Sequence, residues 1–315
     1  MNSSTIKVRV SAIAWVAPSI KLFELTPAEG ALPAFAGGAH ITVTMTPELR
    51  RSYSLVSNPD DQSCYQIAVL LEPESRGGSR YMHEQVKEGD ELEISAPDNY
   101  FPLDTTHSGK HLFIAGGIGI TPFLSYLPTA EAMGLDFELH YCIRSQEQAA
   151  FTQTLQQHLG NKLHFYDASR QQRLNVKELI EQHQDSAHVY VCGPTGLIDD
   201  VVEQGNALLG KERTHFENFG DVENSGDAFE VHFQRSGFSL PVGPDSSILQ
   251  AIEADGRIQV ECLCRNGVCG TCEADILEGE ADHRDSYLDD EEKAEQSTMM
   301  ICVSRAKTSR LVLDL

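Results

Sequence analysis

The sequence has no run of about 18 apolar residues, the length that a helix needs to cross a bilayer, so we expect no membrane-spanning segment. Basic residues are also scarce: 24 Lys and Arg stand against 47 Asp and Glu, which gives a net charge of −23. A surface of this sign repels the phosphates of nucleic acids, and we exclude nucleic-acid binding on that ground. The charge could steer a basic protein partner over long range, and solubility alone explains it equally well.

Cysteine is not spread through the chain as it is in a secreted, disulfide-bonded protein. Of the eight cysteines, five lie between Cys262 and Cys302. Such clustering is typical of a metal site in a reducing compartment, and it predicts a cytoplasmic protein.

The first two-thirds of the chain fall into two regions of different periodicity. Residues 1–107 contain short alternating stretches such as Ile41–Thr46, separated by turn residues, and this pattern predicts an antiparallel β-barrel. Residues 108–220 alternate apolar strand-like runs with helical patterns, among them one over Glu147–Leu159. Alternation of this kind predicts an α/β domain with a parallel sheet.

The last part of the chain predicts a third, smaller domain. Residues 221–227 are polar and acidic and contain glycine, so we expect a linker there. We expect residues 228–315 to form an α+β domain. In it, the capping residues 245–247 and Gly256 flank one short helix.

The strongest motif lies in this third region. Cys264, Cys269 and Cys272 have the spacing Cys-x4-Cys-x2-Cys, and Cys302 follows. This is the plant-type [2Fe-2S] pattern, in which four thiolates hold two irons and glycines let backbone N–H groups turn toward the sulfurs. Structural zinc is the alternative, although zinc sites usually have a second Cys-x2-Cys pair. Cys262 could compete with Cys264 as the first ligand, but the x4 spacing favours Cys264.

Two short motifs in the first region are compatible with a flavin site. In residues 51–55, Arg51 can hold a phosphate, Tyr53 can pack beside a flavin ring, and Ser54 can hydrogen-bond to its reactive edge. The glycine-rich turn at 76–80 precedes a helical stretch, and such a turn is a natural phosphate site. The alternatives are an exposed arginine on a strand and an ordinary surface loop.

The second region carries a glycine loop that can approach a nucleotide. The strand at 111–115 runs into Gly116-Gly117-Ile118-Gly119-Ile120, and Thr121-Pro122 should cap and open a helix. The pattern is not Gly-x-Gly-x-x-Gly. Cys192 ends another strand of the same sheet, at the edge where open parallel sheets bind ligands. A buried thiol without a function is the alternative for Cys192.

In their order along the chain, these motifs resemble the phthalate dioxygenase reductase family, which includes similar vanillate demethylase and carnitine monooxygenase reductases. The resemblance covers the whole chain and is dense in Gly279–Asp285 and Cys302–Lys307. It implies FMN on a six-stranded Greek-key barrel, NADH on the adjoining α/β domain and a plant-type ferredoxin (β-grasp) domain at the C-terminus. It also implies electron transfer through the [2Fe-2S] cluster to a terminal Rieske-type oxygenase.

The resemblance also assigns residues. We expect the FMN site to comprise Arg51, Ser52, Tyr53, Ser54, Gly78 and Ser79. We expect the nicotinamide cleft to comprise Gly116, Gly117, Gly119, Thr121, Cys192, Gly193 and Pro194. Ser54, Cys192 and Phe219 are the candidates for direct contact with the reacting rings, although a core position for Phe219 is nearly as compatible with the sequence.

One departure from the family pattern and several alternatives stay open. Arg265 and Asn266 stand where the family often has Ser or Glu, and a cation there would raise the potential of the cluster or alter docking. The residues alone do not separate FMN from FAD, nor NADH from NADPH. The other functions are a reductase of a hybrid-cluster protein or a haem monooxygenase, and a redox-sensing module without turnover.

Overall fold

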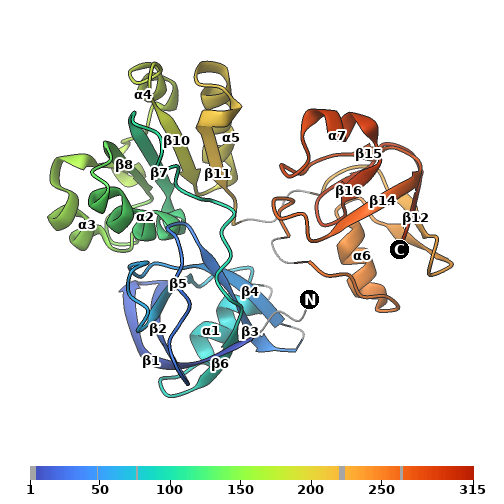
Figure 1. The fold of residues 1–315 in the computed structure, drawn as a ribbon, viewed down its shortest axis with the longest axis horizontal. Coiled ribbons are helices and arrows are strands. Elements are labelled where there is room, and N and C mark those ends of the chain that lie inside the picture. The colour runs from blue at the N-terminus through green and yellow to red at the C-terminus, as the bar shows by residue number, and fades with distance from the viewer. Residues whose placement is uncertain (1–4, 48, 76, 220–223, 263–264) are drawn as a thin grey trace. The chain divides into compact units, whose positions relative to one another are not determined.

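A computed structural model describes residues 5–47, 49–75, 77–219, 224–262 and 265–315 (Figure 1). The chain divides into two compact units, Met1–Phe219 and Gly220–Leu315. The predicted linker at 221–227 lies partly outside the described residues. None of the described helices has both the length and the apolar character needed to span a membrane.

The first unit begins with a six-stranded antiparallel sheet in the order β4-β3-β6-β1-β2-β5. Apolar side chains such as Val8, Val10 and Ile41 alternate with polar ones and are buried inside it. A bridge between Leu55 and Ile67 joins the end of β4 to β5, so the sheet curls into a barrel. The elements are β1 (Ile6–Ala17), β2 (Ile20–Pro27), β3 (His40–Thr46), β4 (Leu49–Ser54), β5 (Tyr65–Leu70), α1 (Gly78–Glu84) and β6 (Glu91–Ile94).

The rest of the first unit is a five-stranded parallel sheet in the order β11-β10-β7-β8-β9. Helices cover both faces, and each face has its own apolar core. The strands are β7 (His111–Gly116), β8 (Phe137–Ile143), β9 (Leu163–Asp167), β10 (His188–Cys192) and β11 (Thr214–Glu217). The helices are α2 (Thr121–Ala132), α3 (Thr152–Leu159), α4 (Val176–Glu181) and α5 (Thr195–Leu208).

Two local predictions in this domain are wrong. Helix α3 begins at Thr152 rather than at Glu147, because Phe151 has a left-handed backbone (φ 60°) that a helix cannot continue through. Thr121 does not cap α2 with its side chain. The glycine loop forms a 3-10 turn instead, and the Thr121 hydroxyl donates to the Ile118 carbonyl at 2.9 Å.

The second unit is a small α+β domain whose sheet has the order β13-β12-β18-β14-β16, with β12 and β18 parallel. The predicted short helix is present: Ser247 forms a capping box with Gln250, and Gly256 ends the helix with φ 76°. The elements are β12 (Phe229–Phe233), β13 (Phe238–Val242), α6 (Ile248–Asp255), β14 (Glu273–Glu278), β15 (Ala281–Asp282), α7 (Asp290–Glu295), β16 (Thr298–Met300), β17 (Arg305–Ala306) and β18 (Arg310–Leu313).

A buried arginine ties this small domain together. Arg305 is 1% exposed, and its guanidinium donates to the carbonyls of Asp227 (2.9 Å), Gly243 (3.0 Å) and Ser246. The Phe229 ring lies 5.2 Å from its Cζ. Because three carbonyls satisfy the guanidinium, its burial is tolerated and the segment before β12 is fixed to β17.

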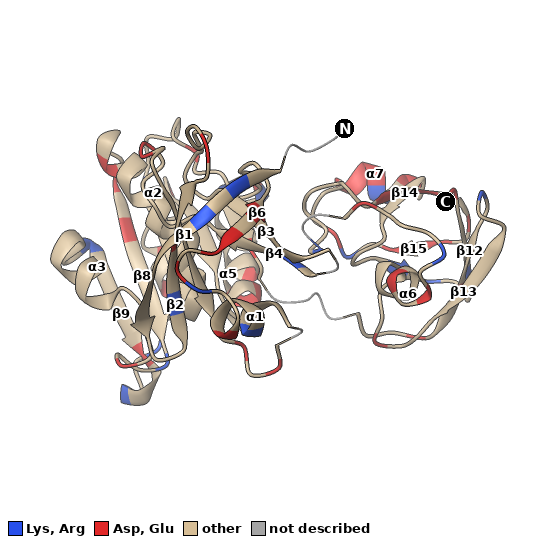
Figure 2. Ribbon diagram, turned by 90° about the horizontal axis from the view of Figure 1, so that it is seen from below, with Lys and Arg blue, Asp and Glu red and all other residues tan. Residues whose placement is uncertain are grey.

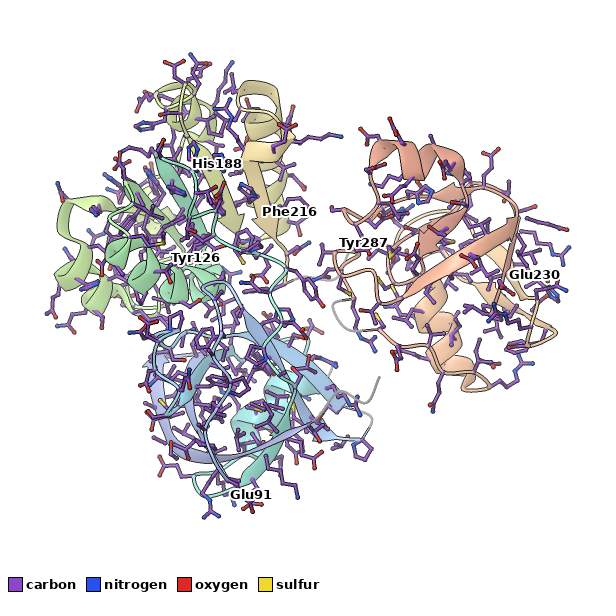
Figure 3. The ribbon with its side chains drawn as sticks, viewed as in Figure 1. Glu91, Tyr126, His188, Phe216, Glu230 and Tyr287 are labelled. Atoms are coloured by element: carbon purple, nitrogen blue, oxygen red, sulfur yellow. The ribbon has the colours of Figure 1, made fainter. Side chains whose placement is uncertain are left out.

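Imidazoles gather at the amino ends of β7, β10 and β11. His188 Nδ1 lies 3.1 Å from His215 Nε2, its ring stacks on His107 at 3.9 Å between centroids, and Asp104 Oδ2 is 3.9 Å away (Figure 3). His111 also faces this group. Burial, followed by the neighbouring imidazoles, lowers the pKa of His188 to about 4, against the attraction of Asp104.

We therefore expect stability to fall in acid. A histidine with a depressed pKa in the folded state keeps its full contribution above the unfolded value near 6.5 and loses it as the pH falls toward 4. For His188 this amounts to about 2 kcal/mol between pH 7.5 and pH 5. His188→Asn should reduce the loss of Tm across that interval, whereas His158→Ala, at an exposed site on α3, should not. Equal acid sensitivity in both variants would refute the assignment.

Candidate redox site

Three thiols converge in the second unit. The sulfurs of Cys262, Cys272 and Cys302 all lie within 4.8 Å of one another, and the last two residues are buried. Cys269 is half-buried, with its Sγ 3.3 Å from Thr271 Oγ1. Cys264 lies outside the described residues, so its role as a ligand stays a prediction. Thiols that meet in this way in the domain core fit a thiolate-held iron–sulfur cluster.

The loop that carries these thiols requires its two glycines. Gly267 and Gly270 have φ of 68° and 74°, a conformation that other residues rarely adopt. A Cβ at Gly267 would lie 2.5 Å from Val303 Cγ2, and one at Gly270 would lie 2.4 Å from Tyr287 Cζ. Backbone conformation and close packing therefore both exclude larger residues from the loop.

Arg265, which departs from the family pattern, forms an ion pair with a carboxylate. Arg265 Nη1 donates to Glu253 Oε2 at 3.0 Å, and Nη2 donates to the other oxygen of the same carboxylate on α6. This bidentate pair offsets the positive charge near the thiols. The influence of Arg265 on a bound cluster is therefore smaller than its sequence position suggests.

The position of Cys262 leads to a paired prediction. The motif spacing favours Cys264 as the first ligand, yet the Cys262 thiol lies beside those of Cys272 and Cys302. We expect Cys264→Ser to lose most of the bound iron and Cys262→Ser to keep it, because a loop with x4 spacing wraps two irons. Iron and acid-labile sulfide per chain measure this. The reverse result would make Cys262 the ligand.

The barrel contains two buried polar side-chain atoms that make no hydrogen bond to another described residue. Tyr53 Oη and Ser54 Oγ are both buried, and neither has a hydrogen-bond partner among the described residues. Burial raises the pKa of Tyr53, and the nearby Arg51 only partly opposes this. Buried polar atoms are normally satisfied, so this pair fits a ring with hydrogen-bonding edges, such as a flavin.

The other predicted flavin residues divide into two groups. Arg51 packs on the start of α1, where a Cβ at Gly78 would lie 2.5 Å from Arg51 Cγ, so the two are together as expected. Ser79 bonds Ser75 Oγ at 2.9 Å and shapes the preceding loop. Ser52 is exposed and its hydroxyl lies 3.1 Å from Thr42 Oγ1, so the structure does not group it with Arg51.

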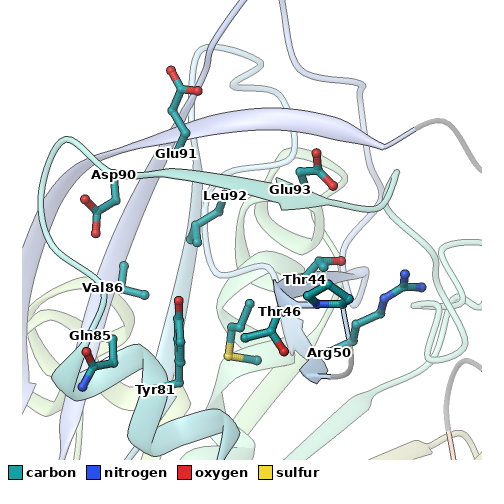
Figure 4. Close-up of a pocket in the computed structure, with 12 residues that line it drawn as sticks. Thr44, Thr46, Arg50, Tyr81, Gln85, Val86, Asp90, Glu91, Leu92 and Glu93 are labelled. Atoms are coloured by element: carbon teal, nitrogen blue, oxygen red, sulfur yellow. The ribbon is translucent and has the colours of Figure 1, made fainter.

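A cavity of about 570 Å³ lies elsewhere on the barrel (Figure 4). It sits at the turn where Thr46 pairs with Leu49, whereas Ser54 pairs with His40 at the other end of the same hairpin. Leu49 and Ser54 are five residues apart along β4, or about 17 Å. The cavity is therefore distant from Ser54, although Tyr81 in its lining belongs to the same helix as Gly78. Its lining includes Arg50, Tyr81, Asp90, Glu91, Leu92 and Glu93.

The predicted nicotinamide loops meet at the carboxyl edge of the parallel sheet. A Cβ at Gly119 would lie 2.2 Å from the Cys192 carbonyl oxygen, and one at Gly193 would lie 2.8 Å from Gly116 Cα. Over Gly117 (φ 55°) no atom lies within 4 Å of such a Cβ. The two loops therefore touch along one side and leave the backbone of Gly117 open, which fits the close approach of a pyrophosphate.

Glu217 was missed from the sequence. It pairs with Cys192 across β10 and β11, its Oε2 is buried without a hydrogen-bond partner, and burial raises its pKa to about 8. A carboxyl group at the carboxyl end of a strand of the parallel sheet was the available signal. Phe219, two residues further on, is 43% exposed, so it is available to a ligand.

We expect Glu217→Gln to stabilise the protein at high pH and to slow its oxidation of NADH. A carboxyl with a raised pKa loses stability as the pH rises from 4.5 to about 8. For Glu217 the loss between pH 6 and pH 9 is roughly 3 kcal/mol, and glutamine removes this cost. If the carboxyl also contacts the nicotinamide and helps to position it, loss of that contact should slow NADH oxidation roughly tenfold. Thermal unfolding at pH 6 and pH 9 and steady-state turnover test both effects. A stability gain without a rate change would leave Glu217 outside the reaction.

Two family profiles match the chain in the expected order. The oxidoreductase NAD-binding domain covers residues 113–203, and the 2Fe-2S iron–sulfur cluster binding domain covers residues 231–307. These matches coincide with the parallel sheet and with the unit that gathers the thiols.

Relatives extend the match to the whole chain. The carnitine monooxygenase reductase subunit of Escherichia coli (strain K12) is 49% identical over 98% of both chains. The heme-dependent oxidative N-demethylase beta subunit of Ectopseudomonas mendocina (strain ymp) is 42% identical over 99% of this chain and 100% of that one. The solved structure of phthalate dioxygenase reductase is 35% identical over 99% and 98% of the chains, with a TM-score of 0.76. Together with the contacting glycine loops and the converging thiols, these findings show that the chain belongs to the phthalate dioxygenase reductase family of NAD- and [2Fe-2S]-binding electron-transfer oxidoreductases.

Proposed function

We propose that this chain is the NADH-dependent reductase component of a two-component oxygenase. The observation that carries the proposal is that one chain combines glycine loops with an open backbone at Gly117, buried polar groups on a barrel without partners among the described residues, and a cluster of converging thiols. When bound, a flavin would take hydride from the nicotinamide and a [2Fe-2S] cluster would release the electrons singly. The protein aligns the groups, and no acid or base from the chain is required for hydride transfer.

We propose FMN as the flavin and NADH as the donor. Arg51 on β4 packs against the start of α1 and suits a single terminal phosphate, and Tyr53 and Ser54 suit the ring. At the end of β9, Arg170 Nε lies 3.5 Å from Asp167 Oδ2. This pairing leaves Arg170 less available to the 2′-phosphate of NADPH. Released flavin and the ratio of kcat/KM for the two donors test both choices.

The acceptor that we propose is the oxygenase component of a carnitine-type monooxygenase, with a Rieske-type centre. The support is the 49% identity to a carnitine monooxygenase reductase subunit. Tyr287 is 49% exposed beside the thiol loop at Gly270, and the acidic helix α7 begins three residues later (Figures 2 and 3). An exposed aromatic next to acidic residues suits a partner with a basic docking face.

A haem protein is the second candidate acceptor, because the N-demethylase beta subunit is 42% identical over nearly the whole chain. The decisive experiment supplies the cofactor-loaded chain with NADH and either a Rieske-type oxygenase or a haem N-demethylase, and follows each centre by absorption. We expect fast reduction of the Rieske centre that slows with salt. Faster haem reduction would favour the second candidate. No NADH oxidation even with ferricyanide would reject the proposal and leave a non-catalytic redox module.

A further inference from the structure

A second group of potential metal ligands lies in the parallel-sheet domain, away from the thiols. Glu138 and His140 are two residues apart on β8, and His164 pairs with His140 on the neighbouring edge strand β9. The donor atoms of these three side chains lie within 4.8 Å of one another. Two-residue spacing and direct cross-strand pairing put all three side chains on one face of the sheet.

We propose that Glu138, His140 and His164 form a binding site for one divalent transition-metal ion of the Zn²⁺ type. The site does not depend on the proposed function.

The distances between donor atoms suit a small tetrahedral ion. Glu138 Oε2 lies 3.4 Å from His140 Nε2 and 3.9 Å from His164 Nε2. Bonds of 2.0–2.1 Å at tetrahedral angles place neighbouring ligand atoms about 3.4 Å apart. The distance from Glu138 to His140 already has this value. The distance from Glu138 to His164 reaches it after a small rotation of the more exposed His164 side chain. Two imidazoles and a carboxylate are a common ligand set for zinc.

Both Nε2 atoms lack a hydrogen-bond partner among the described residues. Nε2 of His140 and Nε2 of His164 are buried, and the His140 side chain is only 3% exposed. The two rings stack at 4.8 Å between centroids and 14° between planes. Both Nε2 atoms also face the same carboxylate oxygen, as the ligands of one ion would. A bound cation would satisfy all three donors.

Neighbouring groups already orient two of the ligands. Tyr166 Oη lies 3.0 Å from His140 Nδ1, so a metal on Nε2 would leave Nδ1–H to donate to the phenol. Lys110 Nζ donates to Glu138 Oε1 at 2.7 Å, which leaves Oε2 for the ion. Outer partners of this kind orient ligands and raise their affinity for metals. His164 is 42% exposed, so a water molecule could complete the coordination.

The site is separate from the nicotinamide cleft. Glu138 and His140 pair with Leu112 and Ile114 on β7. Both of these apolar side chains belong to the core under α4 and α5. Gly119 and Cys192 lie instead at the carboxyl ends of the strands. A metal here would join β8 to the edge strand β9, so its expected effect is on stability.

The test titrates Zn²⁺ into chelator-treated, cofactor-loaded protein by calorimetry. We expect one ion per chain in the wild type, and His164→Ala should weaken it roughly a hundredfold, since even outer-shell partners change affinity by about 10- to 100-fold. Tyr166→Phe should weaken it about tenfold. The control is His158→Ala, which removes a histidine 3.0 Å from Glu131 and should change nothing.

Zinc bound to cysteine would appear equally in all variants, so the difference between His164→Ala and His158→Ala isolates the site. Thermal unfolding gives a second measurement: Zn²⁺ should raise the Tm of the wild type and of His158→Ala but not of His164→Ala. Because His164 is partly exposed, its replacement should not prevent folding. Equal Zn²⁺ affinity in the two variants, or no stoichiometric binding in the wild type, would overturn the proposal.

Discussion

Cys302→Ser is expected to separate the two halves of electron transfer. The Cys302 sulfur is buried next to those of Cys262 and Cys272, and a serine hydroxyl is a poor substitute for a thiolate on iron. NADH oxidation with ferricyanide, which can take electrons directly from a flavin, should stay close to the wild-type rate. Reduction of cytochrome c through the cluster should fall roughly a hundredfold or more, because a two-iron cluster needs four thiolates.

The matched control is Cys64→Ser, because Cys64 is a half-buried thiol on the barrel with no other thiol grouped with it in the described part of the chain. It should leave both activities and the iron content unchanged. Iron analysis and the two acceptor assays on the same preparations make the comparison. If Cys302→Ser delivered electrons to cytochrome c at the wild-type rate, Cys302 would not be a required ligand.

Gly119→Ala should block the entry of electrons instead. The added Cβ would lie 2.2 Å from the Cys192 carbonyl oxygen and 2.4 Å from its carbonyl carbon. These are backbone atoms of β10 that cannot rotate away, so the carboxyl ends of β7 and β10 must separate. Because misplacement of reacting groups by about 1 Å can cost roughly a hundredfold, NADH oxidation should fall by about that factor.

Gly196→Ala is the control for this substitution. Gly196 lies in α5 of the same domain, and a Cβ there would meet no atom within 4 Å. It should oxidise NADH normally. Protein carrying Gly119→Ala and reduced chemically with dithionite should still reduce cytochrome c, which would show that the cluster unit is intact. Normal NADH oxidation by Gly119→Ala would mean that the loop at Gly116–Gly119 does not line the nicotinamide cleft.

Local patterns in the sequence predicted most of the architecture. Ser247 and Gly256 bound a helix because capping depends on residues within one turn. The strands from His111 to Cys192 were recognisable because apolar runs between helical patterns indicate a parallel sheet. The predicted start of α3 was wrong because the helical periodicity of the sequence continues through Phe151. The left-handed backbone of that residue depends on its tertiary surroundings.

The sequence by itself determined the kind of chemistry. Its two signals are the spacing of Cys264, Cys269 and Cys272 and the glycines before Thr121. Both signals are local, because a cluster loop and a phosphate loop are each built from consecutive residues. Only the tertiary structure decided which distant residues meet. Strand register placed Glu217 beside Cys192 and His164 beside His140. Register is set by the packing of whole strands against helices, and no short stretch of sequence contains that information.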